Sequence, residues 1–150
     1  MSEPITVVEL RPQRIASVRR TVPQADLGAF FGEVFPKVFG QLAAQGAKPA
    51  GPPLARYFNN DPAAFDTEAG VPFDGGFKPS GDVRVTELPG GKAAKTVHLG
   101  RYDTLSAEYK RIMTWADTVG TRLGGDPWEV YVKDPEVDGE AVTEVYFPIA

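Results

Sequence analysis

The chain has 150 residues, of which 42% are hydrophobic and 24% charged, so we expect one folded domain with a packed core. Its 16 basic and 20 acidic side chains leave a net charge of −4. This balance argues against nucleic-acid and anionic-membrane partners, because phosphate groups are bound by clustered cations. The absence of cysteine excludes disulfides and thiolate chemistry, and a single histidine excludes a histidine-rich metal site.

Targeting and cofactor signals are missing from the sequence. No apolar run approaches the roughly 20 residues that cross a bilayer, and residues 1–4 do not open a signal peptide, so we expect a cytoplasmic protein. Pro89–Ala93 lacks the first glycine and the hydroxyl of a phosphate loop. Asp134–Gly139 resembles the start of a calcium loop, but Val145 stands where the bidentate glutamate belongs. We therefore predict no cofactor and no bound metal.

A weak internal duplication organises the chain into two halves, at about residues 4–74 and 81–150. Each half has an alternating strand ending in Glu-Leu, a second strand, a helix, a tyrosine-bearing strand and a strand with Thr-Glu, and residues 74–81 form a loop between the halves. The pattern predicts an α+β fold with antiparallel sheets and two packed helices. A two-fold-like pairing of the halves predicts a ligand cleft between them.

Both predicted helices carry an apolar stripe at helical spacing. Pro36 interrupts the first pattern, so we expect that helix to kink or split. Gly120 suits the C-terminal end of the second. The first stripe consists of Leu27, Phe30, Phe31, Val34, Val38 and Leu42, and the second of Leu105, Tyr109, Ile112, Ala116 and Val119.

The strand at residues 128–132 carries the most informative pattern. Alternation places Trp128, Val130 and Val132 on one face, which their composition marks as the core face. Glu129 and Tyr131 then share the opposite face.

Two other strands carry similar residues. Tyr57 belongs to the corresponding strand of the first half, and Glu144 and Tyr146 share a face of the last strand. Carboxylates and phenols are therefore expected to converge on one surface between the halves. The alternative is that this face is solvated and its residues are ordinary exposed positions.

A glutamate in a ring-lined cleft would have a raised pKa, because its charged form loses hydration. A cationic ligand would compensate, and aromatic rings would add cation–π attraction. Trp115 lies at the edge of the second apolar stripe, where it either walls such a site or packs in the core. His98 has no second histidine or cysteine to pair with, and Ser17 and Ser106 show no triad pattern.

At this point the residues resemble a known family, the GyrI-like small-molecule-binding domain, which is the effector-binding domain of AraC-type and MerR-type multidrug regulators. The resemblance covers essentially the whole chain. The matching segments are Leu88–Ala94, Gly100–Leu105, Trp128–Tyr131 with Asp134-Pro135, and Thr143–Ile149, together with Tyr57-Phe58 and Thr67–Pro72 of the first half.

The resemblance implies a single domain over residues 1–150, built from two βαββ repeats with pseudo-two-fold symmetry and a ligand cleft between them. It implies that Glu129 is the central carboxylate contacting the ligand. It also implies that the aromatic side chains of Tyr57, Trp115, Tyr131 and Tyr146 line the cleft.

Regulators of this group carry a DNA-binding module N-terminal to the domain, whereas this sequence begins with its first strand, so we expect a stand-alone member. The leading hypothesis is a protein that binds hydrophobic, aromatic or cationic drug-like compounds. The resemblance also implies two alternatives: a hydrolase of cyclopropane-bearing alkylating natural products, and an inhibitor that contacts gyrase. In the hydrolase, Glu129 would position or activate water and Tyr131 would assist. The ligand and the oligomeric state stay open.

Overall fold

The computed structural model describes residues 2–133 and 141–150, so the calcium-loop-like segment Asp134–Gly139 lies outside the described residues. The chain forms two compact units. One comprises residues 12–89 and is called the α1 unit. The other comprises residues 1–11 and 90–150 and is called the α2 unit.

The α1 unit is an antiparallel sheet with one helix. Its strands pair in the order β4-β5-β2-β6, and a two-residue strand, β3, pairs with the end of β5. The elements in chain order are β2 (Gln13–Val22), a short 3-10 turn (Gln24–Asp26), α1 (Leu27–Ala44), β3 (Lys48–Pro49), β4 (Leu54–Tyr57), β5 (Phe65–Asp74) and β6 (Arg84–Leu88).

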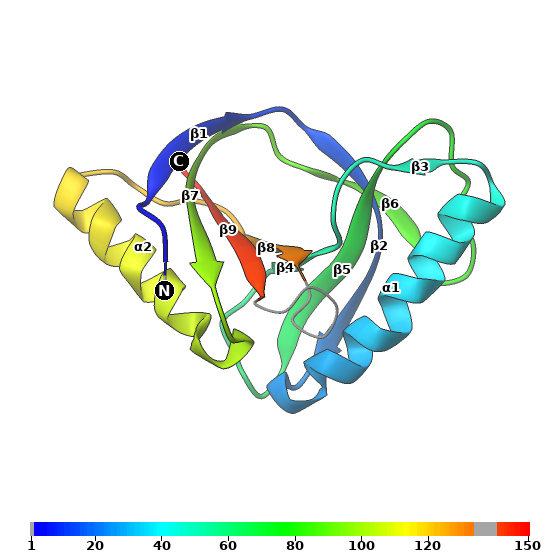
Figure 1. The fold of residues 1–150 in the computed structure, drawn as a ribbon, viewed down its shortest axis with the longest axis horizontal. Helices are drawn as coiled ribbons and strands as arrows, with labels where there is room; N and C mark the ends of the chain where they lie inside the picture. The colour runs from blue at the N-terminus through cyan, green and yellow to red at the C-terminus, as the bar shows by residue number, and fades with distance from the viewer. Residues whose placement is uncertain (1, 134–140) are drawn as a thin grey trace. The chain divides into compact units, whose positions relative to one another are not determined.

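Helix α1 lies beside β5 and β2 (Figure 1) and packs against one face of the sheet. The predicted stripe is confirmed, because Phe30, Val34, Val38 and Leu42 are all buried. The prediction was that Pro36 kinks or splits the helix; it lies inside α1 without ending it, so the split is wrong, and the kink stays a prediction. Proline removes only one backbone donor, and the burial of the stripe on both sides of it holds the helix together.

The α2 unit has the same kind of architecture, with strands in the order β1-β7-β9-β8 and α2 beside β7 (Figure 1). Gly120 ends the helix with a φ of 72°, as predicted, because glycine adopts this left-handed conformation without strain. The elements are β1 (Thr6–Leu10), β7 (Gly91–Leu99), a 3-10 turn (Tyr102–Thr104), α2 (Ser106–Val119), β8 (Trp128–Lys133) and β9 (Val142–Pro148).

The core of the α2 unit joins the helix to the middle of the sheet. Leu105 and Ile112 pack with Ala94 and Val145. Val119, the last member of the predicted stripe, is 54% exposed, so the stripe ends one turn before the helix does.

The α+β fold with antiparallel strands and two packed helices is confirmed. The compact units differ from the predicted halves in one respect. β1 pairs with β7, and β6 pairs with β2, so the first strand of each predicted half joins the sheet of the other unit. The pseudo-two-fold relationship stays a prediction. None of the described helices is long and apolar enough to span a membrane.

Candidate functional site

Glu129 lies on the face of the β7-β9-β8 sheet that α2 covers. It stands directly opposite Val145, a core residue, and paired residues of neighbouring strands share a face. Tyr131 follows on the same face, opposite Thr143. Only 6% of Glu129 is exposed. The carboxylate is therefore buried between the sheet and the helix of its own unit.

Two phenols hold this carboxylate, one on each oxygen. The hydroxyl of Tyr109, on α2, donates to Oε1 at 2.6 Å, and the hydroxyl of Tyr131, on β8, donates to Oε2 at 2.8 Å. The ring of Tyr102 meets the ring of Tyr131 edge-on, with 5.9 Å between the centroids. The result is a carboxylate surrounded by tyrosine side chains, which we call the Glu129 cluster: Glu129, Tyr102, Tyr109 and Tyr131.

Burial raises the pKa of Glu129 above its ordinary value, because the ionised form loses its hydration. The hydrogen bonds from Tyr109 and Tyr131 and the charge of His98 oppose this shift without cancelling it. Among the residues that the structure describes, no lysine or arginine forms an ion pair with Glu129. A cation brought to this carboxylate would therefore gain an interaction that the protein itself leaves unmade.

The predicted convergence of Glu129 with Glu144 and Tyr146 is wrong. Tyr146 stands opposite Trp128 and stacks on it, with ring centroids 5.5 Å apart, so Tyr146 lies on the other face of the sheet. The Tyr146 hydroxyl does donate to Glu144, at 3.0 Å, which confirms that these two share a face. The register between β8 and β9 separates the two pairs, and this register is not visible in either strand alone.

The predicted core face of β8 is confirmed at Trp128, which is 4% exposed, but not at Val132, which is 40% exposed. Glu129, on the opposite face, is 6% exposed. Both faces of the strand are therefore covered at its start, and the cover ends before Val132.

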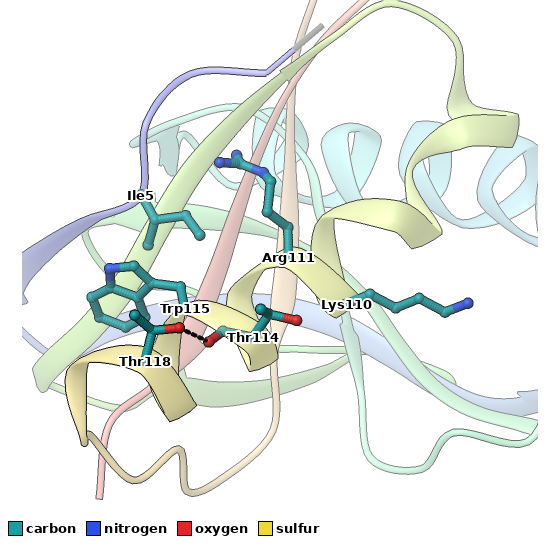
Figure 2. A pocket seen from close by; sticks show the side chains of 6 residues that line it. All are labelled: Ile5, Lys110, Arg111, Thr114, Trp115 and Thr118. Carbon is teal, nitrogen blue, oxygen red and sulfur yellow. Dashed lines mark hydrogen bonds between the residues drawn. The ribbon is translucent and has the colours of Figure 1, made fainter.

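Tyr57 and Trp115 each have a described partner within their own unit. Tyr57 belongs to the α1 unit, where its ring meets Phe65 edge-on at 5.3 Å. Trp115, on α2, packs beside Ile5 in an open pocket of about 500 Å³ (Figure 2). The Lys110 side chain extends away from that indole, and Arg111 points toward the strands. Trp115 is thus both a partner of the core and the wall of a surface pocket.

His98 has a partner that the sequence pattern did not indicate. Its Nδ1 lies 2.6 Å from Oε2 of Glu108, and both side chains are buried. Its Nε2 lies 2.9 Å from the carbonyl oxygen of Arg101 and 3.0 Å from the Thr104 hydroxyl. Arg111 donates to Oε1 of Glu108 at 2.9 Å. This network ties α2 to β7 beneath the Glu129 cluster.

The α1 unit contains a buried carboxylate of its own, Glu68, at 3% exposure. Its Oε2 accepts hydrogen bonds from Ser17 at 2.7 Å and Thr86 at 2.6 Å. Gly70, two residues further along β5, allows Ser17 to approach, since a Cβ there would lie 2.8 Å from the serine Cβ. No aromatic hydroxyl is bonded to Glu68 among the described contacts, so its surroundings differ in kind from those of Glu129.

Sequence reasoning missed Tyr109 as a site residue because it fitted the apolar stripe of α2. A signal was nevertheless present: a tyrosine on a buried helix face needs a partner for its hydroxyl. Glu108 beside it is also buried, and an acidic residue on a covered face predicts a buried polar network.

An α+β domain that buries a carboxylate among tyrosines has the composition of a small-molecule site, in which apolar walls surround a few well-placed polar groups. The chain belongs to the family of the GyrI-like small molecule binding domain, which it matches over residues 3–150. The resemblance found in the sequence is thereby confirmed.

Several solved structures share this fold. The EcmrR C-terminal domain is 22% identical, with a TM-score of 0.86 over 98% of this chain and 97% of that one. EcmrR in its DNA complex is 23% identical, with a TM-score of 0.83; the match covers 99% of this chain and 57% of that one. A hydrolase from Listeria innocua is 12% identical, with a TM-score of 0.67 over 97% of this chain and 91% of that chain.

SAV2435 bound to tetraphenylphosphonium is 10% identical, with a TM-score of 0.62 over 99% of this chain and 94% of that chain. No curated protein matches the chain in sequence. At these identities the similarity shows the fold, and the ligand has to be argued from the site itself.

Proposed function

We propose that this protein binds hydrophobic, aromatic and cationic small molecules at the Glu129 cluster. The observation that carries this proposal is a buried carboxylate that has two phenol donors and, among the described residues, no cationic partner. The family is one of small-molecule-binding domains, and SAV2435, which shares the fold, was solved with an organic cation.

The physical basis is charge compensation in a site of low polarity. Burial penalises the ionised Glu129, and a monovalent organic cation removes part of that penalty while giving up little hydration of its own. Tyrosine faces add cation–π attraction, which strengthens when water is excluded. Tyr102 is 44% exposed, so its ring is accessible as the outer wall of the site.

The test uses tetraphenylphosphonium as the cation and triphenylphosphine oxide as a neutral analogue with similar rings. Binding is measured by calorimetry at neutral pH to the native protein and to Glu129→Gln. We expect Glu129→Gln to lose most of the affinity for the cation and little of the affinity for the neutral compound. The matched control is Glu144→Gln, on the opposite face of the same sheet, which is expected to bind the cation normally.

Two results would refute the cation site. One is equal affinity of the native protein and Glu129→Gln for the cation. The other is an equal loss in Glu144→Gln, which would indicate a general effect of net charge rather than a specific carboxylate.

A second candidate function is hydrolysis of cyclopropane-bearing alkylating compounds. It is favoured by the chemistry of the Glu129 cluster, because a carboxyl group with a raised pKa next to a phenol suits general acid–base catalysis. Glu129 would position or deprotonate a water, and Tyr131 would stabilise the charge that develops as the strained ring opens. A Listeria innocua protein with this fold is described as a hydrolase.

The two functions are separated by turnover. The protein is incubated with a cyclopropane-bearing alkylator, and the product with one added water is sought by mass spectrometry. A hydrolase produces this product in excess of the enzyme, and Glu129→Gln abolishes it. Tight binding without any such product leaves the binding function alone.

A further inference from the structure

Thr143 is a buried polar residue that stands opposite Tyr131 of the Glu129 cluster. It is the second residue of β9 and has 0% exposure. Its Oγ1 has no hydrogen-bond partner among the residues that the structure describes. Buried hydroxyls are almost always bonded to protein or to an internal water, and valine would fill the same space without the cost of an unpaired hydroxyl.

The sheet register places Thr143 beside other polar residues on the face of the sheet that α2 covers. It stands opposite His98 on β7 and opposite Tyr131 on β8. Glu129 is its diagonal neighbour on β8, because Glu129 pairs with Val145. Diagonal neighbours are roughly 7–8 Å apart, with their Cβ atoms somewhat closer. That separation suits one intervening water better than a direct contact between a threonine and a glutamate.

Of the polar groups around Thr143, His98 has both ring nitrogens bonded, whereas Glu129 can accept further hydrogen bonds. Both ring nitrogens of His98 are occupied, by Glu108 on one side and by Arg101 and Thr104 on the other. The carboxylate of Glu129 accepts two hydrogen bonds, and a carboxylate has about four acceptor positions.

We propose that Thr143 holds a buried water molecule that donates to the Glu129 carboxylate and accepts from the threonine hydroxyl. Thr143 is then a positioning residue: it acts on the ligand-binding carboxylate through the water and does not contact the ligand. These two groups give the water the two polar partners that a buried water needs. The water site belongs to the protein without ligand and does not depend on which ligand binds.

The consequence is an extra donor to the ionised form of Glu129. Hydrogen bonds to a carboxylate favour its charged state, so the water opposes the effect of burial. The ionisable groups that share this covered face, and that set the same charge balance, are Tyr109 and Glu108 on α2, His98 on β7, Tyr102 on the 3-10 turn and Tyr131 on β8.

The experiment compares Thr143→Val, which removes the hydroxyl at constant shape, with Thr143→Ser, which keeps it. Thermal unfolding and the titration of Glu129, followed by carbon-13 NMR of the glutamate carboxyl groups, are measured for both. We expect Thr143→Val to melt at a lower temperature and its Glu129 to titrate at higher pH, because a donor to the carboxylate has been lost. Thr143→Ser, which keeps the hydroxyl, is expected to have the melting temperature and the Glu129 titration of the native protein.

The matched control is Thr86→Val in the α1 unit, which removes a hydroxyl that donates to Glu68. It is expected to lower the melting temperature and to leave the Glu129 titration unchanged. The proposal is overturned if Thr143→Val melts at or above the native temperature, as expected for a dry, unpaired hydroxyl. It is equally overturned if Thr143→Val destabilises the protein but does not move the Glu129 titration.

Discussion

Removal of the hydrogen bond from Tyr109 to Glu129 is the most direct test of the site as the structure describes it. Tyr109→Phe removes one hydroxyl and keeps the ring that packs against the core of the α2 unit. The 2.6 Å bond that is lost reaches a carboxylate that is 6% exposed. The change therefore removes one donor to a buried carboxylate.

The magnitude follows from the charge state of Glu129. A hydrogen bond to a charged group contributes about 1.5–3 kcal/mol, whereas one between neutral groups contributes about 0.5–1.5 kcal/mol. The pKa of Glu129 is already raised by burial. Losing a donor to the ionised form raises it further, so the variant binds its proton more tightly when folded. Stability that is present at low pH is then lost as pH rises through the folded pKa.

We therefore expect Tyr109→Phe to be destabilised by about 1.5–3 kcal/mol where Glu129 is ionised, and by roughly half as much where it is protonated. Urea unfolding at a series of pH values measures the loss of stability, and carbon-13 NMR of Glu129 measures the rise of its pKa. Tyr146→Phe, which removes a donor to Glu144 on the opposite face, is expected to leave the Glu129 titration unmoved. A loss of stability in Tyr109→Phe that is constant across pH, with an unchanged Glu129 titration, would refute the reasoning.

Three further predictions concern the fold that supports the site. Gly70→Ala is expected to destabilise by about 1–3 kcal/mol in urea unfolding, because its Cβ would lie 2.8 Å from the carbonyl oxygen of Ala16 and from the Cβ of Ser17; native stability would contradict this. Burial raises the pKa of Glu108, but hydrogen bonds, including those from His98 and Arg111, outweigh burial and lower it overall. The stability that Glu108 contributes is therefore present above its unfolded pKa and lost as pH falls through the folded one, and Glu108→Gln should flatten the acid limb of the stability profile; an unchanged acid limb would argue against the network. Ile112→Ala, at a 0% exposed position in the α2 core, is expected to cost about 2–5 kcal/mol, and a change within 1 kcal/mol would mean that α2 is not packed as described.

Local pattern was sufficient for the elements and for the shared face of Glu129 and Tyr131. The stripe of α1 follows from helical spacing, and the end of α2 follows from the backbone freedom of Gly120, both of which depend only on neighbours in sequence. Alternation places Glu129 and Tyr131 on one face of the strand, and the register confirms this, but alternation leaves open whether that face is covered or solvated. The structure buries Glu129, and its role toward a ligand stays a prediction.

Pattern also failed in instructive places. A tyrosine at an apolar helical position is indistinguishable from a core residue until its hydroxyl has a partner, and Tyr109 finds that partner 20 residues away. His98 has no second histidine or cysteine to pair with in the sequence, but Glu108 lies ten residues further along, on the helix that packs over its strand, and bonds to it.

The sequence alone predicts the α+β class, the two helices, the strands and the family of this protein. Each of these depends on local periodicity or on motifs of consecutive residues. Only the tertiary structure decided which side chains meet. The pairing of β8 with β9 put Tyr146 on the opposite face from Glu129, and the packing of α2 brought Tyr109 to the carboxylate. A shift of one residue in register exchanges the two faces of a strand, and that register depends on the whole sheet rather than on any segment of the chain.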